Sequence, residues 1–415
     1  MSGKTRGPLL VVWLASTLLF LGAWERLHHG SYASYQIVDT PVYQNYGDAI
    51  VRDHRMPYRD FTVEYPPAAL PMFVVPALGG YGEGGDPPDA RYRHRFELLM
   101  VACALLALAA GAATLVGAGA SLVRTALALG AVALAPLLLG SVVLSRFDYW
   151  PAALTVVALS LLVAGRLRLA AVAIGVGVAA KVYPGVLLPL LLADAWRTRG
   201  REEAGRCALV AAAAAVLCFA PFLVVSPDGV WESVQRQTGR PLQLETLGSG
   251  ALMVAHDLFG LKATIVSSFG SQNLQTRFSG VAATLTTLLQ IGSLVAIWAL
   301  YWKRGSGRED TIRYAAAAVT AFVAFGKVLS PQYLIWLIPL VPLVGGRRGL
   351  AAGALLALAL ALTAAWFPHH YWTLVQTLDV PYSGYVLERD LVLVALAALL
   401  AWPAARGEPE PARSG

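Results

Sequence analysis

Charged side chains are scarce in this sequence. Only 14% of the 415 residues are Asp, Glu, Lys or Arg, whereas hydrophobic residues make up 57%. A typical soluble domain carries about 25% charged residues. This composition, together with repeated apolar runs of about 20 residues, indicates an all-α polytopic membrane protein. The runs are continuous in Ala, Leu and Val rather than alternating, which excludes an outer-membrane β-barrel.

Cysteine and the common catalytic motifs are also rare or missing. The three cysteines, Cys103, Cys207 and Cys218, all lie inside apolar runs, which excludes a disulfide framework or a ligand cluster. No Walker motif, G-x-G-x-x-G, H-E-x-x-H or G-x-S-x-G occurs, so nucleotide-driven chemistry and the common hydrolases are disfavoured. A sugar or phosphate donor is therefore expected to come from the membrane.

The net charge of +7 does not indicate a nucleic-acid partner. No basic, aromatic-interleaved soluble domain is present to bind one. In a membrane protein such an excess more often reflects arginines that fix the topology on the cytoplasmic side.

Twelve apolar runs are predicted to span the membrane. They are residues 8–24, 96–119, 122–144, 149–165, 168–180, 184–196, 206–226, 280–302, 312–328, 332–346, 349–367 and 388–405. The first is predicted to be a retained signal anchor, because no small-x-small cleavage site follows it. The stretch 167–196 is divided because Lys181 and Pro184 interrupt it, and neither is tolerated well within one continuous span.

The arginines predict the orientation of these spans. With the N-terminus in the cytoplasm, the arginine-rich connections all fall on the cytoplasmic side, as the positive-inside rule requires. That result requires the proline-rich stretch 66–78 to be an interfacial helix rather than a span. Both termini are then cytoplasmic and the protein is expected in the plasma membrane.

The predicted organisation is one integral-membrane domain, residues 1–405, followed by a short cytoplasmic tail, residues 406–415. Two long loops lie on the outer side, residues 25–96 and 227–280. Most other connections are short. The first outer loop holds the densest group of acids in the chain, so we expect the chemistry there.

Asp39 is the main candidate for a general base in that loop. It lies among aromatic and β-branched neighbours, Tyr35 to Tyr43, where an acid near a membrane surface can have an altered pKa. The alternative is a helix N-cap, because a proline follows at position 41. Residue type alone favours the cap. For Asp60 and Glu64, the alternative to a functional role is a structural one, in which they tether the loop to Arg55 or Arg59.

Three cations are predicted at the outer ends of spans. Lys181 and Lys327 each lie near a helix-breaking proline, and Arg146 lies in Ser145-Arg146-Phe147-Asp148. A lone lysine at such a place either extends to the headgroups or binds a phosphate. Neutralisation of Arg146 by Asp148 is the alternative to phosphate binding. Together the three cations suggest a surface that binds phosphate.

Two further segments suggest sugar binding. In the second outer loop, Arg240, Gln243 and Glu245 provide planar polar groups, although a structural pair between Arg240 and Glu245 is equally consistent with the sequence. His369 and His370 follow the eleventh span. They lack cysteine or acidic partners at ligand spacing, which disfavours a metal site.

Several short motifs together resemble a known family. They are the early Asp-x-x-Val-Tyr, Pro57-Tyr58, Glu64-Tyr65-Pro66-Pro67, Lys181-Val182-Tyr183-Pro184 and Ser330-Pro331-Gln332-Tyr333. Their order and shared outer location resemble the GT-C superfamily of integral-membrane glycosyltransferases, in particular family 87, the polyprenyl-phosphate-mannose-dependent mannosyltransferases. The matching motifs extend over residues 39–336.

The resemblance implies a GT-C-type fold and an enzyme that moves a hexose, expected to be mannose, from a polyprenyl-phosphate donor to a lipid or cell-envelope glycan. It implies that Asp39 is the base of an inverting displacement. Lys181, Arg146 and Lys327 would bind the donor phosphate. The remaining residues predicted to contact substrate are Tyr43, Tyr58, Glu64, Tyr65, Tyr183, Arg240, Gln243, Glu245, Gln332, Tyr333, His369 and His370.

The expected partners are the lipid-linked donor, the acceptor and membrane lipids. No cofactor is expected, since the donor is itself a substrate. Asp39 stands alone where many GT-C proteins carry two adjacent acids, which argues against a metal-assisted mechanism but leaves a divalent metal open. The competing hypotheses are a flippase of polyprenyl-linked lipids and a structural subunit of an envelope complex.

Overall fold

The computed structural model describes residues 3–80, 88–305 and 307–403. The predicted tail, residues 406–415, lies outside them. The first half contains α1 (Gly3–Arg26), α2 (Ser31–Ser34), α3 (Thr40–Val51), η1 (Pro67–Ala69), α4 (Leu70–Ala77), α5 (Pro88–Gly117), α6 (Leu122–Leu139), η2 (Gly140–Leu144), α7 (Tyr149–Val163), α8 (Leu167–Ala180), η3 (Tyr183–Leu187) and α9 (Leu188–Arg199), where η marks a 3₁₀-helix.

The second half continues with further helices and one hairpin. Its elements are α10 (Arg201–Val225), α11 (Pro227–Thr238), α12 (Leu247–Phe259), β1 (Thr264–Ser268), β2 (Ser271–Gln275), α13 (Ser279–Arg304), α14 (Gly307–Ala324), η4 (Pro331–Trp336), η5 (Val341–Leu343), α15 (Gly346–Trp366), α16 (Tyr371–Thr377) and α17 (Val380–Ala401). Helices therefore dominate, as predicted.

Six helices of the described chain are long and apolar enough to cross a membrane: α1, α5, α6 with η2, α10, α13 and α15. Each of the other six predicted spans also coincides with helical structure: α7, α8, η3 with α9, α14, η4 with η5, and α17. The all-α membrane class is confirmed.

The predicted span 332–346 differs from an ordinary helix. The chain forms two short 3₁₀-helices there, η4 and η5, instead of one continuous α-helix. Pro331, Pro339 and Pro342 remove the backbone donors that an α-helix needs at these positions. Neighbouring helices bury the segment almost completely, so its irregular backbone is enclosed by protein, as membrane depth requires.

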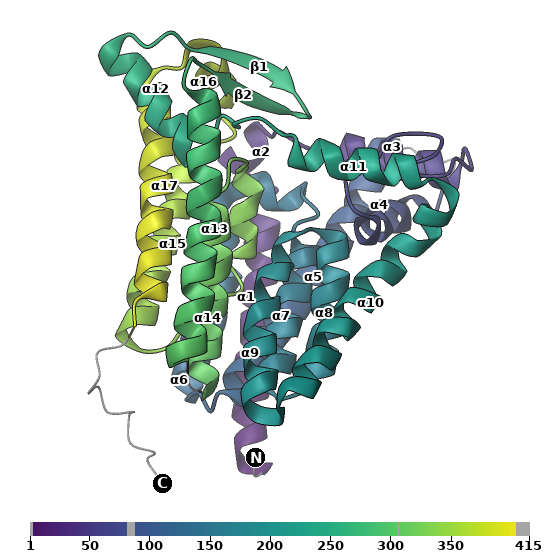
Figure 1. Ribbon diagram of the computed structural model, residues 1–415, viewed down its shortest axis with the longest axis vertical. Helices are drawn as coiled ribbons and strands as arrows, with labels where there is room; N and C mark the ends of the chain where they lie inside the picture. Colours follow the sequence, from purple (N-terminus) through teal and green to yellow (C-terminus); the bar gives the residue numbers. More distant parts are fainter. Residues whose placement is uncertain (1–2, 81–87, 306, 404–415) are drawn as a thin grey trace.

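The two long loops lie at one end of the bundle. Figure 1 shows α3, α4, α11, α12 and the hairpin at the top, and the start of α1 and the end of α17 at the opposite end. We call the end formed by the described residues of the segments 25–96 and 227–280 the loop end. The described parts of both loops thus lie at the same end of the bundle.

The opposite end gathers the arginine-rich turns. Arg199 donates to the Gly165 carbonyl at 2.6 Å, and Arg308 donates to the Gly117 carbonyl at 2.7 Å. Arg348 likewise donates to the Trp402 carbonyl at 2.7 Å. These carbonyls close helix C-terminal turns, which lack intrahelical donors and carry partial negative charge. We call this the arginine end.

Helices α3 and α4 hold the first loop against the bundle. A Cβ at Gly47 would lie 2.3 Å from the Phe73 carbonyl oxygen, so the two helices approach as closely as only glycine allows. The Tyr92 hydroxyl of α5 donates to that same carbonyl at 3.0 Å. The predicted helix within 66–78 is present as η1 and α4. Its contacts fix α3 and therefore Asp39, which precedes it.

The second loop contains a β-hairpin that the sequence analysis did not predict. Strands β1 and β2 pair antiparallel across a Phe269-Gly270 turn in which both residues have positive φ, as a type I′ turn requires. The segment 242–244 adds to β2 through the amides of Leu244 and Leu274. Its other edge bonds the Lys327 carbonyl through the Gln243 amide at 3.0 Å. Gln243 and Glu245 are thereby fixed by backbone pairing.

Candidate active site

Asp39 and Arg146 form an ion pair at the loop end. The Asp39 side chain is 31% exposed and the Arg146 side chain only 5% exposed. Asp39 occupies the N-cap position of α3, but its side chain makes no cap hydrogen bond. Tyr43, one turn along α3, donates its hydroxyl to Asp39 Oδ2 at 3.4 Å. The carboxylate is thus directed to the arginine while remaining accessible.

Arg146 lies between η2 and α7, where the chain turns beneath the first loop. Its Nη2 donates to the Ile37 carbonyl at 3.3 Å, so one guanidinium holds both the backbone and the side chain of the segment 37–39. Burial lowers the pKa of Arg146 to about 10, and the negative charges of Asp148 and Glu245 oppose that shift. The guanidinium therefore stays charged at neutral pH.

Lys181 lies beside Asp148 rather than in open solvent. Its Nζ is 2.6 Å from Asp148 Oδ1, and the same oxygen accepts from the Trp336 indole at 2.7 Å. The ammonium also lies about 5 Å from the ring centres of Phe147, Tyr333 and Trp336, within cation–π range. Asp148 is only 1% exposed.

These contacts show which acid pairs with Arg146. Asp148 contacts Lys181 directly and reaches Arg146 only through its field, whereas Asp39 forms the ion pair with Arg146. Burial lowers the pKa of Lys181, while Asp148 raises it and the nearby cations Arg240 and Arg146 lower it further. Positive groups from three segments therefore converge.

The second loop supplies a polar group to the same region. Gln243 Nε2 donates to Glu245 Oε2 at 2.5 Å and to Ser330 Oγ at 2.7 Å. Glu245 is 2% exposed, and desolvation raises its pKa to about 7 despite the opposing charges of Arg389 and Arg240. The predicted Arg240–Glu245 ion pair does not form among the described residues.

Arg389 of α17 supports this loop from below. It is fully buried, donates to the Glu245 carbonyl at 2.6 Å, and pairs with the neighbouring Asp390. A guanidinium inside a helix bundle is retained where it has partners of this kind. Arg389 thus connects a membrane-spanning helix to the backbone of Glu245.

Aromatic rings form one wall beside the carboxylates. Tyr43 stacks on Phe73 with ring centres 4.6 Å apart, and Tyr65 meets Phe147 edge to face at 4.9 Å. Burial raises the pKa of Tyr43 and of Tyr65, so both hydroxyls stay protonated. Trp336 is sandwiched between Tyr183 and Tyr333 at 3.9 and 4.1 Å.

Several buried polar atoms here lack a hydrogen-bond partner among the described residues. They are Ser145 Oγ, Arg146 Nε, Tyr149 Oη, Arg240 Nε and Gln243 Oε1. Buried polar groups are rarely left unpaired in native proteins. Their concentration in two short segments, 145–149 and 240–243, is typical of a site that receives a polar ligand.

The profile of glycosyltransferase family 87 matches residues 61–331, which is more than half of the sequence. The chain belongs to glycosyltransferase family 87. The profile of the mannosyltransferase PIG-M matches residues 268–401. No curated protein matches the sequence.

One solved structure that resembles this enzyme is ArnT from Cupriavidus metallidurans bound to undecaprenyl phosphate. The two chains are 15% identical with a TM-score of 0.45, over 95% of this chain and 75% of that one.

Membership of family 87 confirms the predicted membrane glycosyltransferase. The competing hypotheses of a flippase and of a structural subunit are set aside, because the matched family consists of transferases. The match begins at residue 61, beyond Asp39. A role for Asp39 in this family 87 enzyme therefore depends on the geometry described above.

Some predicted residues of the enzyme lie away from the Asp39–Arg146 pair. Lys327 is directed to the Thr238 carbonyl, at 2.9 Å, and its own carbonyl holds Gln243. Tyr58 donates to the Tyr65 carbonyl at 2.6 Å and packs on Phe222 of α10. Both contacts hold loop segments together.

The other residues predicted from the sequence also differ in where their side chains lie. His369 lies over Tyr35, with ring centres 6.0 Å apart, near the segment that carries Asp39, whereas His370 stacks on Tyr382 at 4.6 Å. The Glu64 carboxylate lies against Gly270 of the hairpin turn. Asp60 pairs with Arg59 at 2.8 Å, which agrees with the structural tether given as the alternative. For Gln332 the structure gives no side-chain contact that places it in the site.

Four features of the candidate site were not predicted from the sequence: Trp336, Ser330, Arg389 and the role of Asp148 as partner of Lys181. An Arg-Asp pair inside an apolar run, 389–390, was a detectable signal, because charges within a span usually mark function. The other three depend on contacts between distant segments.

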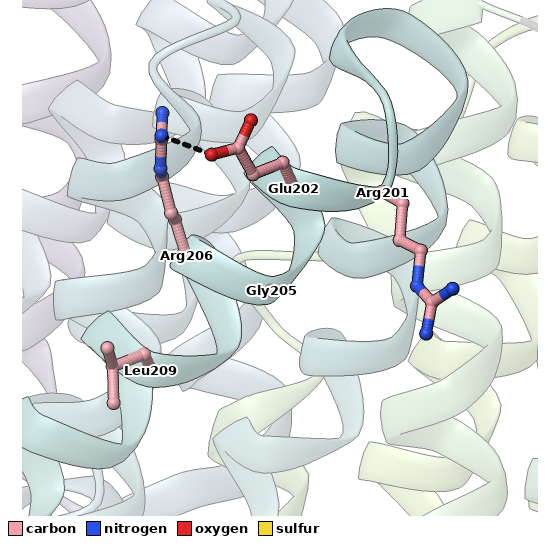
Figure 2. Close-up of a pocket in the computed structure, with 5 residues that line it drawn as sticks. All are labelled: Arg201, Glu202, Gly205, Arg206 and Leu209. Atoms are coloured by element: carbon pink, nitrogen blue, oxygen red, sulfur yellow. Dashed lines mark hydrogen bonds and ion pairs between the residues drawn. The ribbon is translucent and has the colours of Figure 1, made fainter.

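The pocket drawn in Figure 2 is a separate feature. It is lined by Arg201, Glu202, Gly205, Arg206 and Leu209, all near the start of α10 at the arginine end. Its charges are largely satisfied by the Arg206–Glu202 pair at 2.6 Å, drawn as a dashed line. Among the described residues no group of three His, Cys, Asp or Glu side chains is arranged to hold a metal.

Proposed function

We propose that this family 87 enzyme transfers mannose from a polyprenyl-phosphate donor to a hydroxyl of a lipid or cell-envelope glycan. The observation that carries the proposal is the accessible Asp39 carboxylate paired with the buried Arg146 guanidinium at the loop end. One group can accept a proton and the other can hold a phosphate, which are the two requirements of this transfer.

The proposed reaction is a single displacement. Asp39 accepts the proton of the acceptor hydroxyl while that oxygen forms a bond to the anomeric carbon. The bond between this carbon and the phosphate oxygen breaks, and the lipid phosphate leaves with the electron pair. Attack opposite the leaving group inverts the anomeric configuration. General base catalysis of this kind typically contributes about 10²–10⁴-fold.

Arg146 and Lys181 are proposed to stabilise the phosphate charge that develops as the bond breaks. Arg146 offers a planar set of donors suited to phosphate oxygens. Lys181 acts through its field, because Asp148 already occupies its ammonium group. Lys327 is the weakest candidate of the three, since it is directed to the Thr238 carbonyl.

The sugar is proposed to lie between the second loop and the aromatic wall. Gln243 and Glu245 present amide and carboxyl groups to hydroxyls, and Arg240 Nε is buried without a partner among the described residues. Tyr65 and Tyr333 offer ring faces beside them. The remaining candidates, Tyr43, Tyr58, Glu64, Tyr183, Gln332, His369 and His370, would support this surface.

We further propose that the loop end faces the outside of the plasma membrane and that both ends of the chain are cytoplasmic. The support is the gathering of arginines at the opposite end, which the positive-inside rule places in the cytoplasm. A membrane-impermeant maleimide should label Asp53→Cys in intact cells and leave Arg201→Cys unlabelled, in a background without the native cysteines. The reverse pattern contradicts this orientation.

The reaction is tested with purified protein in vesicles loaded with polyprenyl-phosphate-[³H]mannose and a membrane-glycan extract as acceptor. Asp39→Asn is expected to lower transfer by at least about 10²-fold, while Asp53→Asn, an exposed acid of the same loop, keeps the wild-type rate. If Asp39→Asn keeps full transfer, the assignment of Asp39 as the general base is wrong. If the wild type forms no glycosidic product with this donor but does so with another lipid-linked hexose, the assignment of mannose as the transferred sugar is wrong.

A further inference from the structure

The ion pair between Asp39 and Arg146 raises a question about the proposed mechanism. The same carboxylate that is to accept a proton lies on the guanidinium that is to hold the donor phosphate. A carboxylate oxygen engaged by an arginine is a weaker proton acceptor, because the positive charge favours its ionised form. The two roles therefore compete until something separates the two side chains.

We propose that the donor phosphate exchanges with Asp39 on Arg146, so that donor binding itself releases the base. This inference rests on the proposed function of the site. Before exchange, Arg146 holds Asp39 in place. After exchange, the phosphate takes the guanidinium and Asp39 is free to accept the acceptor proton.

The charges of the site favour this exchange. Within the site, the cations Arg146, Lys181 and Arg240 lie near the carboxyl groups of Asp39, Asp148 and Glu245. A phosphodiester adds one negative charge. With all three acids ionised, the site would then hold more negative than positive charge, which is unfavourable in a buried region. One carboxylate must give way or take up a proton.

Exposure and contacts identify Asp39 as the carboxylate that gives way. Asp148 is fixed by Lys181 and Trp336 through one oxygen. Glu245 is fixed by Gln243 and by the bond from Arg389 to its carbonyl. Asp39 is the most accessible of the three, and the residues just before it, 36–38, form neither helix nor strand. When the Asp39 side chain turns away, it loses only its pair with Arg146 and the 3.4 Å contact with the Tyr43 hydroxyl.

Arg146 is able to hold a new partner without losing its place. It is buried, its Nη2 bonds the Ile37 carbonyl, and its Nε lacks a partner among the described residues. A guanidinium carries five donors in a fixed fork, so it can hold the backbone on one side and a phosphate on the other. The arginine remains while the anion on it changes.

The exchange also acts after transfer. The departing lipid phosphate carries one more negative charge than the donor, and Asp39 now carries the acceptor proton. When Asp39 loses that proton it returns to Arg146 and competes with the phosphate, which promotes product release. Asp39 is thus both the base and the displacing group.

Binding of a synthetic polyprenyl phosphate to the protein in nanodiscs tests the exchange. Asp39→Asn removes the competing charge, so we expect this variant to bind the probe about threefold to tenfold more tightly than the wild type, in line with the modest strength of a partly exposed ion pair. Asp39→Ser should do the same, and it serves if the asparagine variant does not fold. Arg146→Gln should bind at least tenfold more weakly.

Asp53→Asn is the matched control and should bind the probe as the wild type does. Equal or weaker binding by Asp39→Asn and Asp39→Ser overturns the exchange. The transfer assay keeps the two proposals apart. If Asp39→Asn loses transfer but does not bind the probe more tightly, the proposed exchange is wrong and Asp39 can still be the base. If Asp39→Asn keeps full transfer, Asp39 is not the base, whatever its affinity for the probe.

Discussion

The two ends of the molecule use charge in different ways. At the arginine end, arginines bond to the carbonyls of helix C-terminal turns and to acids, of which Glu202 is exposed and Glu203 is buried. At the loop end, the buried Arg146 and the partly buried Lys181 meet carboxylates of other segments. Both ends contain ion pairs, so the presence of a pair does not distinguish them.

Burial decides how strongly a charge depends on its partner. An exposed pair is screened by water and contributes little to stability, about 0–1 kcal/mol. A buried charge must have a partner, and removing that partner leaves it uncompensated. We propose that a polar substrate is the physical reason why the loop end keeps the Arg146 and Lys181 charges. Four changes test this comparison.

The largest effect is expected for Asp148→Ala. This change leaves the partly buried Lys181 without its counter-charge and removes the acceptor of the Trp336 indole. Breaking a buried pair from one side typically destabilises by about 3–5 kcal/mol. Thermal unfolding in nanodiscs measures the loss. The double variant Asp148→Ala with Lys181→Met should recover part of it, and no recovery would show that the pair is not the cause.

Arg146→Lys should lower the transfer rate by about 10²–10³-fold, or roughly 3–4 kcal/mol of transition-state stabilisation. A lysine keeps the charge but loses the fork of donors that reaches both Ile37 and an anion. The matched change at the arginine end, Arg206→Lys, should transfer mannose at the wild-type rate. Equal effects of the two substitutions would contradict the distinction between the ends.

The raised pKa of Glu245 predicts that the free energy of unfolding depends on pH. Burial raises its pKa in the folded state to about 7, above the ordinary value of about 4.3. Because the folded state holds the proton more strongly, stability falls as pH rises from about 4.5 to 7 and then levels off. Relative to Glu245→Gln, the wild type should lose on the order of 1–3 kcal/mol over this range. Parallel melting curves at all pH values would refute the shift.

The smallest effect is expected for Glu202→Gln. Its partner Arg206 remains exposed to water when the pair at 2.6 Å is lost, so neither charge is stranded. Melting temperature and transfer rate should both match the wild type. A marked loss at this position would mean that the arginine end holds more than topology signals and helix-terminal contacts.

Much of the architecture could be predicted from the sequence because it depends on local composition. Low charge and long apolar runs indicate membrane helices, and proline at positions 331, 339 and 342 explains why one run is irregular. The gathering of arginines indicated which connections share an end. The hairpin 264–275 was missed, because a short pair of polar-rich strands carries a weak signal beside apolar helices.

The site was predicted only in part. Residue type and neighbours singled out Asp39, Arg146 and Lys181, and the family resemblance gave Asp39 its expected role. Lys327 and Tyr58 were chosen for the same kind of reason, yet their side chains secure loops. A lysine near a proline has the same local sequence whether it is directed to a substrate or to a backbone carbonyl.

By itself, the sequence determined the membrane class, the placement of the helices and the sharing of one end by both long loops. These follow from hydrophobicity and charge, which act residue by residue along the chain. Only the tertiary structure decided which acid meets which base. Asp39 takes Arg146 and Asp148 takes Lys181, although Asp148 is the nearer acid to Arg146 in sequence. Ion pairing in a buried site depends on distances across the fold, which the order of residues does not contain.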